Sequence, residues 1–318
     1  MTTRREQEKR KKDEKSRLAR PRLYPYAYLT PAWLSLIVLS FIPIVATVII
    51  AFTNFSLNHL NDAKWVGLQN FRLILAGPFA GAFFPLLAWT FMFAALSTVL
   101  VYALGLFLAT LLNNKNMRES YVYRALLIIP WAVPGTIAVL SWSGVLNQSA
   151  GAMNAVLHLF GLQPIPWLND PLWAKVSMIG VNLWLGYPFM MNAALGALSS
   201  IPEDLYESAD LDGAGWWQKM RWITLPLLTG ATLPLLISTF GYNFNNFGMV
   251  YLLTGGGPPS MTNAFVGKSD ILISAAYKMT LTFNRYDLAS AFSLVIFAIV
   301  AVITAVNMKA THAFEEVD

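Results

Sequence analysis

The sequence predicts an all-α, polytopic membrane protein with six transmembrane helices. Of its 318 residues, 56% are hydrophobic and only 12% are charged, about half of the charged fraction that is usual in soluble domains. Six blocks contain no Asp, Glu, Lys or Arg, and each can supply the roughly 20 apolar residues that cross a bilayer. Such runs are too long for barrel strands, so helices are favoured. The blocks are 23–61, 73–114, 125–169, 176–202, 222–267 and 288–308.

The expected spans lie within or close to these blocks and divide the chain into three parts. Residues 1–28 form a basic cytoplasmic tail, 29–311 a six-helix transmembrane domain with a polar loop at 201–226, and 312–318 a short C-terminal tail. We interpret the basic tail as a signal that keeps the N-terminus inside, in preference to a specific lipid or partner site. The spans are 29–53, 86–112, 122–146, 174–198, 226–252 and 287–308.

The distribution of positive charge orients the chain, because Lys and Arg concentrate in cytoplasmic loops. With the N-terminus inside, 16 of the 22 Lys and Arg residues fall on inner segments and 6 on outer ones. We therefore expect both termini and the 201–226 loop in the cytoplasm. The outer loop at 147–173, with Trp167 and Trp173, has the composition of an amphipathic interfacial helix with aromatic anchors.

No pattern of catalytic or metal-binding residues emerges. The chain has no cysteine, and its three histidines lack the spacing of a metal site. Gly267–Ser269 resembles the end of a phosphate-binding loop, but the glycine that should begin this loop is absent. We therefore expect no enzyme, no metal site and no cofactor; if the chain uses ATP, partner subunits hydrolyse it. The histidines are His59, His158 and His312.

Uncharged polar and aromatic side chains gather in the fifth expected span. Helical spacing places Tyr242, Asn243 and Asn246 within one face. Buried amides are costly without hydrogen-bond partners. A hydroxyl-rich solute, held by amide hydrogen bonds and aromatic stacking, would be such a partner. The alternative is that these asparagines join helices to one another.

Proline breaks the third expected span and should kink the fourth, and transporters place their binding sites at interrupted helices. Trp131 and Gly135 lie near the break in the third span, and Gly186 and Phe189 near Pro188 in the fourth. For these residues simple packing is the alternative to substrate contact. The substrate-binding candidates are Trp131, Gly135, Gly186, Phe189, Tyr242, Asn243 and Asn246.

The polar loop between the fourth and fifth spans has a distinctive spacing. It reads Glu207-Ser208-Ala209, then Gly213 after three residues, and Ile223-Thr224-Leu225-Pro226 after nine more. Pro202 suits the first turn of a short helix over about 203–211. Across the loop, acidic residues come early and basic ones late, which is the order that a helix dipole favours. A bend at glycine and a second short turn should follow. The pattern resembles the EAA loop of permease subunits in bacterial ABC importers, with Ser208 in place of the first alanine.

The resemblance covers about residues 120–311 and is to the maltose-type branch of these permeases. It rests on phrases such as LLIIPWAVPG (126–135), NLWLGYPFMMN (182–192) and NFNNFGMVYLLTGGGP (243–258). It implies the type I ABC importer permease fold in the bacterial inner membrane. It also implies a sister permease, two ATPase subunits and an extracytoplasmic sugar-binding protein, with membrane lipid around the spans and no nucleic acid partner. ATP-driven alternating access would then import an oligosaccharide, in the first place maltose or maltodextrin.

The resemblance also assigns residues that couple the chain to its ATPases. Glu207 would contact the ATPase or stabilise the loop, and Gly213 would permit the bend. The branch often has tyrosine at Trp131 and serine at Gly135, so the sugar stays open. Alternatives are another disaccharide, glycerol phosphate, or a membrane sensor or scaffold that recruits an ATPase. The coupling residues are Glu207, Ser208, Ala209, Asp210, Gly213, Ile223, Leu225 and Pro226.

Overall fold

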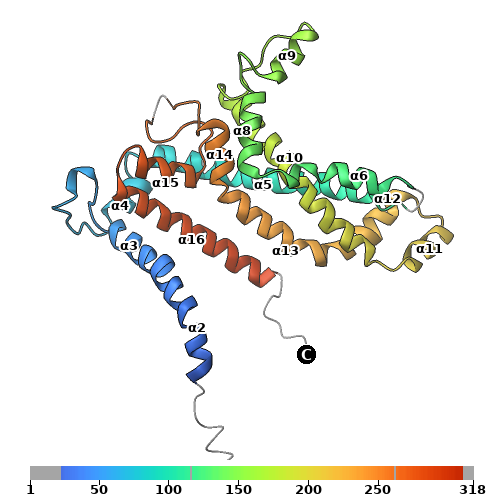
Figure 1. Cartoon of the computed structure of the whole chain (residues 1–318), viewed down its shortest axis with the longest axis horizontal. Helices are drawn as coiled ribbons and strands as arrows, with labels where there is room; N and C mark the ends of the chain where they lie inside the picture. Colours follow the sequence, from blue (N-terminus) through green and yellow to red (C-terminus); the bar gives the residue numbers. More distant parts are fainter. Residues whose placement is uncertain (1–22, 115–116, 261–262, 311–318) are drawn as a thin grey trace, which may run out of the picture. The chain divides into compact units, whose positions relative to one another are not determined.

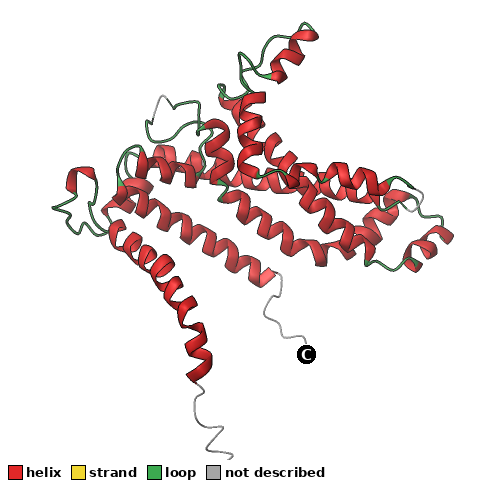
Figure 2. Ribbon diagram, viewed as in Figure 1, coloured by secondary structure: helices red, strands yellow, loops and turns green. Residues whose placement is uncertain are grey.

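The computed structural model describes residues 23–114, 117–260 and 263–310. The described residues are mostly helical, and among them strand pairing is limited to one isolated antiparallel bridge, Thr53 to Trp65 (Figures 1 and 2). The chain separates into two compact units, residues 1–50 and 51–318. Most of the expected N-terminal tail, the C-terminal tail and His312 lie outside the described residues.

The first unit contributes one long apolar helix. It comprises α2 (Leu23–Leu36), the π-helical turn η1 (Ile37–Phe41) and α3 (Ile42–Ala51). The 24 residues Tyr28–Ala51 are long and apolar enough to cross a membrane, and only 6% of their most apolar window is buried. This helix corresponds to the expected span at 29–53, and its exposed apolar side chains suit a surrounding of lipid or protein.

The second unit is organised around α5 (Ala80–Leu112) and α10 (Pro171–Ser199), which pack along each other. Two glycines permit their close approach. A Cβ atom at Gly105 would lie 2.7 Å from Met190 Cβ, and one at Gly186 would lie 2.9 Å from Val101 Cγ2. Small residues at such crossings are typical of membrane helix pairs.

Two further long helices complete this unit. The helix α13 (Leu225–Phe244) packs on α5, and α16 (Tyr286–Ala310) packs on α15 and α4. Shorter elements connect the long helices. These are η2 (Leu57–His59), α4 (Gln69–Leu75), α6 (Ser120–Leu127), α7 (Ile129–Ala132), α8 (Gly135–Val145), α9 (Ala152–Leu159), α11 (Asp204–Leu211), α12 (Trp216–Lys219), η3 (Met220–Thr224), α14 (Phe247–Thr254) and α15 (Leu272–Leu281).

The described residues contain four helices that are long and apolar enough to span a membrane, against six expected spans. The expected third span is divided into α6, α7 and α8, with the break at the prolines that predicted it. The expected fourth span is the 29-residue α10, which is long enough but is less apolar and continues through Pro188. The four helices are Tyr28–Ala51, Ala80–Leu112, Trp216–Phe244 and Tyr286–Ala305.

The expected fifth span, 226–252, is not one helix. The helix α13 ends at Phe244 and α14 begins at Phe247. Asn246 starts the new helix, because its side-chain oxygen accepts a hydrogen bond of 3.3 Å from the backbone N–H of Met249. The expectation of a continuous helix was wrong because the amide of Asn246 caps a helix instead of lying along one.

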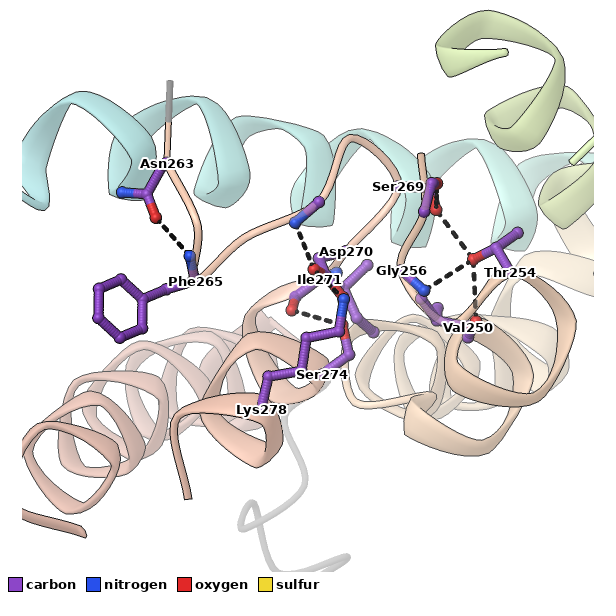
Figure 3. A network of polar contacts seen from close by, with 12 residues as sticks. Val250, Thr254, Gly256, Asn263, Phe265, Ser269, Asp270, Ile271, Ser274 and Lys278 are labelled. Atoms are coloured by element: carbon purple, nitrogen blue, oxygen red, sulfur yellow. Dashed lines mark hydrogen bonds and ion pairs between the residues drawn. The ribbon is translucent and has the colours of Figure 1, made fainter. Parts of the chain in front are cut away.

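A buried ion pair holds the loop between α14 and α15 (Figure 3). Asp270 is fully buried and accepts hydrogen bonds from Gly267 N (2.6 Å), Ser274 Oγ (2.8 Å) and Lys278 Nζ (2.7 Å). Gly256 packs against this carboxylate in a left-handed conformation (φ 75°), and a Cβ atom there would overlap Asp270. The buried carboxylate of Asp270, with its hydrogen bonds satisfied, therefore holds the Gly/Pro-rich segment after α14 against α15.

Candidate substrate cavity and coupling loop

A cavity of about 590 Å³ lies among α5, α7, α8, α10, α13 and α14. All seven substrate-binding candidates line it, although they come from three separate stretches of the sequence, 131–135, 186–189 and 242–246. Its lining, drawn from the described residues, contains no Asp, Glu, Lys or Arg. The seven are Trp131, Gly135, Gly186, Phe189, Tyr242, Asn243 and Asn246.

A chain of side-chain amides forms one wall of the cavity. Asn246 Nδ2 donates to Asn182 Oδ1, Asn182 Nδ2 donates to Asn243 Oδ1, and each distance is 3.1 Å. Asn243 Nδ2 then donates to Thr98 Oγ1, also over 3.1 Å. Asn243 is only 2% exposed, so its amide joins α13 to α5 and α10. Asn246 is less buried and is the better placed of the two to meet a solute.

Aromatic faces line the cavity beside this polar wall. Trp131 and Phe189 come from different helices, and their ring centroids lie 6.3 Å apart at an interplanar angle of 48°. Both rings are exposed, as is the ring of Tyr242. The cavity thus combines flat apolar faces with hydrogen-bonding groups, which is the usual composition of a small-molecule site.

The two glycines of the cavity have different surroundings. An added Cβ at Gly135 would meet no atom within 4 Å, whereas one at Gly186 would collide with Val101. Gly186 is therefore required by the packing of α10 on α5, in line with the alternative stated for it above. Gly135 has room for a larger side chain and leaves open space in the cavity wall.

The sequence reasoning missed Asn182, the amide that bridges Asn243 and Asn246. It lies in α10 four residues before Gly186, so helical spacing would have placed both on one face. Thr98 was missed as well, because a threonine in an apolar helix usually bonds to its own backbone. The structure also adds the hydroxyl groups of Thr136, Ser238 and Thr239 to the lining.

The candidate coupling loop, residues 201–226, has the predicted conformation. The helix α11 ends at Leu211, and Gly213, just beyond it, adopts a left-handed conformation with φ 75°. Ala214 N donates to Ala209 O (2.9 Å) and Gly213 N to Asp210 O (3.1 Å), which together form a Schellman helix end. The short helix α12 and the π-helical η3 then lead to Pro226.

Two side-chain contacts hold the halves of the loop together. Lys219 Nζ lies 2.6 Å from Asp210 Oδ1, and the hydroxyls of Tyr206 and Thr224 lie 2.9 Å apart. The outer surface of the loop is apolar as well as charged: Leu211 is 91% exposed, and Trp216 and Trp217 are also exposed. A second cavity, of about 540 Å³, separates the loop from the ends of α5 and α10.

The individual coupling candidates divide by exposure. Those in the first half of the loop project into solvent, except for the half-buried Ala209, whereas Ile223 and Leu225 are half-buried at the start of the following helix. Pro226 is exposed at the second position of α13. The first half of the loop is therefore exposed to solvent, and the second half leads directly into the long helix α13. The exposed members are Glu207, Ser208, Asp210 and Gly213.

Comparison with known families identifies this architecture. The profile of the family described as "binding-protein-dependent transport system inner membrane component" matches residues 101–311. The chain belongs to this family. It is therefore a permease component of a binding-protein-dependent transport system, as the EAA-type loop indicated, and the resemblance to ABC importer permeases is confirmed.

Relatives of this permease are named as sugar transport proteins. It is 40% identical over 298 residues to the galactooligosaccharides transport system permease protein GanP of Bacillus subtilis, covering 92% of this chain and 71% of GanP. It is 38% identical over 308 residues to the maltodextrin permease MalC of Streptococcus pneumoniae, covering 93% and 71% of the two chains. It is 41% identical over 253 residues to MalF of Salmonella typhimurium, covering 78% and 49%.

A solved structure confirms the fold. A chain of a bacterial ABC transporter for the import of alginate matches this permease with a TM-score of 0.75 and 22% identity. The match covers 92% of this chain and 96% of that one. The permease therefore has the fold of an ABC importer membrane subunit, and its relatives are transport permeases and not enzymes.

Proposed function

We propose that this permease forms the membrane pathway of an ATP-driven importer for a neutral oligosaccharide, with maltose or maltodextrin as the first candidate. The observation that carries the proposal is the cavity of about 590 Å³, which joins amides and aromatic rings without a charged side chain. Relatives named for maltodextrin and for galactooligosaccharides support a neutral hexose oligomer. A different disaccharide is the main alternative.

The absence of charge from the cavity lining argues against phosphorylated or acidic substrates. A phosphate or carboxylate group would lose its hydration here without an Arg or Lys side chain to compensate its charge. The described lining offers amides and hydroxyls instead. Glycerol phosphate is therefore disfavoured, whereas a sugar can exchange its hydrogen bonds to water for bonds to Asn246 and Tyr242 and stack on Trp131.

In this proposal the coupling loop moves as one piece. The contacts from Asp210 to Lys219 and from Tyr206 to Thr224 tie α11 to the base of α13. A displacement imposed on Glu207 or Gly213 by an ATPase would thus reach a helix that lines the cavity. The loop must contact the ATPase differently in two states, because equal contacts would shift no equilibrium. The eight coupling candidates act in this interface.

The proposal includes the complete assembly and its topology. The segment α6–α8 and the helix α10 supply the two crossings that, with the four long apolar helices, make six. Residues 29–311 form the membrane domain, and both the 1–28 tail and the 312–318 tail lie in the cytoplasm. A sister permease, two ATPase subunits and an extracytoplasmic sugar-binding protein complete the importer.

The test is purification of the tagged chain in mild detergent from its own membranes, followed by transport in proteoliposomes. We expect a second permease and an ATPase to co-purify. ATP hydrolysis should rise with binding protein and maltotriose, but not with glycerol phosphate. If only a galactose oligomer stimulated hydrolysis, the proposed substrate would change, but the proposed role as an importer would stand. Recovery of the chain without an ATPase at any salt concentration would contradict the proposal and favour a sensor or scaffold.

A further inference from the structure

The segment that contains α9 is held in a fixed conformation by one buried side chain. Asn154 Nδ2 donates to the carbonyl oxygens of Gln148 and Ile165, both over 2.9 Å. Its Oδ1 accepts from Ile165 N (3.0 Å) and Trp167 Nε1 (2.9 Å). These bonds use both donors and both acceptor sites of the amide. The 148–167 segment is therefore a preformed structure.

The far end of α9 is equally well defined, and it is apolar. Leu162 N donates to Leu157 O and Gly161 N to His158 O, each over 3.0 Å, and Gly161 has φ 71°. This is a Schellman helix end. It leaves Leu159, Phe160 and Leu162 projecting as a rigid tip, and these residues are 83%, 76% and 55% exposed. No contact within the described chain accounts for these three side chains.

The charge pattern distinguishes this loop from the other two predicted outer loops. The loop at 147–173 has one charged residue, Asp170, which caps the start of α10, and no Asp, Glu, Lys or Arg occurs in 147–169. The loop at 54–85 contains Asp62, Lys64 and Arg72, and the loop at 253–286 contains the Asp270–Lys278 ion pair. A surface that meets water or a soluble protein usually carries charged residues around its apolar centre. A rigid, uncharged tip with three exposed apolar side chains is suited to the boundary of a bilayer.

We propose that the α9 tip, formed by Leu159, Phe160 and Leu162, inserts into the boundary between lipid headgroups and acyl chains. The paired rings of Trp167 and Trp173, whose centroids lie 5.0 Å apart at the base of the segment, suit the same layer. Asn154 satisfies the backbone groups of Gln148 and Ile165 internally, which is needed where the segment faces lipid. The occupant of this surface is thus the membrane itself.

The position of the tip gives the contact a consequence for transport. The helix α9 follows directly on α8 (Figure 1), and α8 contributes Gly135, Thr136 and Val139 to the cavity wall. Anchoring the end of α8 in the interface limits the tilt of this short helix, which is not continuous with α6. The wall formed by α8 would then keep its place relative to the bilayer while other helices move.

Site-directed spin labelling tests the contact, since the chain has no cysteine to remove. The probe positions are Phe160→Cys and, as a matched control on the exposed outer loop, Ala63→Cys. The label is a nitroxide in the co-purified complex in lipid nanodiscs. Dissolved oxygen concentrates in lipid and a nickel chelate stays in water. We expect the ratio of oxygen to nickel accessibility to be several-fold higher at position 160 than at 63.

Three outcomes would overturn the proposal. Equal nickel accessibility at both positions would place the tip in water, and shielding of position 160 from both reagents would place it against a protein. A further variant guards against local misfolding: Leu159→Glu with Phe160→Glu should raise nickel accessibility of a label at Leu162→Cys, and no change would contradict lipid contact. These readings do not depend on the substrate, so an error in the proposed sugar would leave them unaffected.

Discussion

Gly213 permits a direct test of the coupling loop. It has φ 75°, a conformation that side chains other than glycine adopt at a cost, but an added Cβ would meet no atom within 4 Å. The requirement for glycine is therefore one of backbone conformation and not of space. Gly213→Val should disturb the bend after α11 while leaving the surrounding packing intact, because the residue is exposed.

The magnitude follows from the conformation. Placing an ordinary side chain in the left-handed region costs roughly 1–2 kcal/mol, and a β-branched side chain is at the upper end of this range. Such a cost lowers the population of the bent loop by about 5- to 30-fold. Gly213→Asn is the matched control, because asparagine tolerates this region with a smaller penalty. The expected order of coupling is therefore wild type, then asparagine, then valine.

The assay is oligosaccharide-stimulated ATP hydrolysis by the reconstituted complex, together with the amount of variant recovered from the membrane. We expect normal recovery of Gly213→Val. Stimulation of ATP hydrolysis by oligosaccharide should fall by about 5- to 30-fold, the same factor by which the population of the bent loop falls. Hydrolysis and sugar uptake at wild-type levels would refute the argument that the bend transmits motion. Equal losses for asparagine and valine would show that the site is sensitive to bulk and not to φ.

Three further predictions concern contacts that stabilise the fold. Asn243→Ala leaves buried partners unsatisfied and should lower stability by about 1–3 kcal/mol, measured as thermal unfolding in detergent; an unchanged midpoint would contradict its role as a helix link. Asp270→Asn should cost about 3–5 kcal/mol by leaving Lys278 unpaired, and Asp270→Asn with Lys278→Met should recover part of this. Gly186→Ala should destabilise the chain by about 1–3 kcal/mol through overpacking, whereas Gly135→Ala should leave thermal stability unchanged.

The coupling loop could be predicted in detail because its signals are local. The end of α11 needs a left-handed residue, and Gly213 supplies it within a few residues of the acidic residues that favour the helix. The spacing from Gly213 to Pro226 predicted the second turn that follows the bend. No long-range contact was needed to place the helix, the bend and the second turn, and the structure reproduces all three.

The cavity residues could be grouped from sequence, but their individual roles could not. Prolines and uncharged polar groups indicated the right helices. Asn243 is hydrogen-bonded to Thr98 and Asn182, and Asn246 caps the start of α14 while its amino group bonds to Asn182. These contacts depend on which helices pack together. Pairings over 61 and 145 residues of sequence separation leave no local signal.

The amide chain of the cavity wall has a direction. The backbone N–H of Met249 can only donate, so Asn246 must turn its oxygen toward it and its amino group toward Asn182. The orientation of Asn246 fixes that of Asn182, which in turn fixes that of Asn243, whose amino group donates to Thr98. Hydrogen bonds aligned in this way polarise one another. An Asn246→Asp change would place a carboxylate oxygen against the side-chain oxygen of Asn182. Relief of this repulsion would require the amides along the chain to reorient as far as Thr98 on α5, three side chains from the substitution.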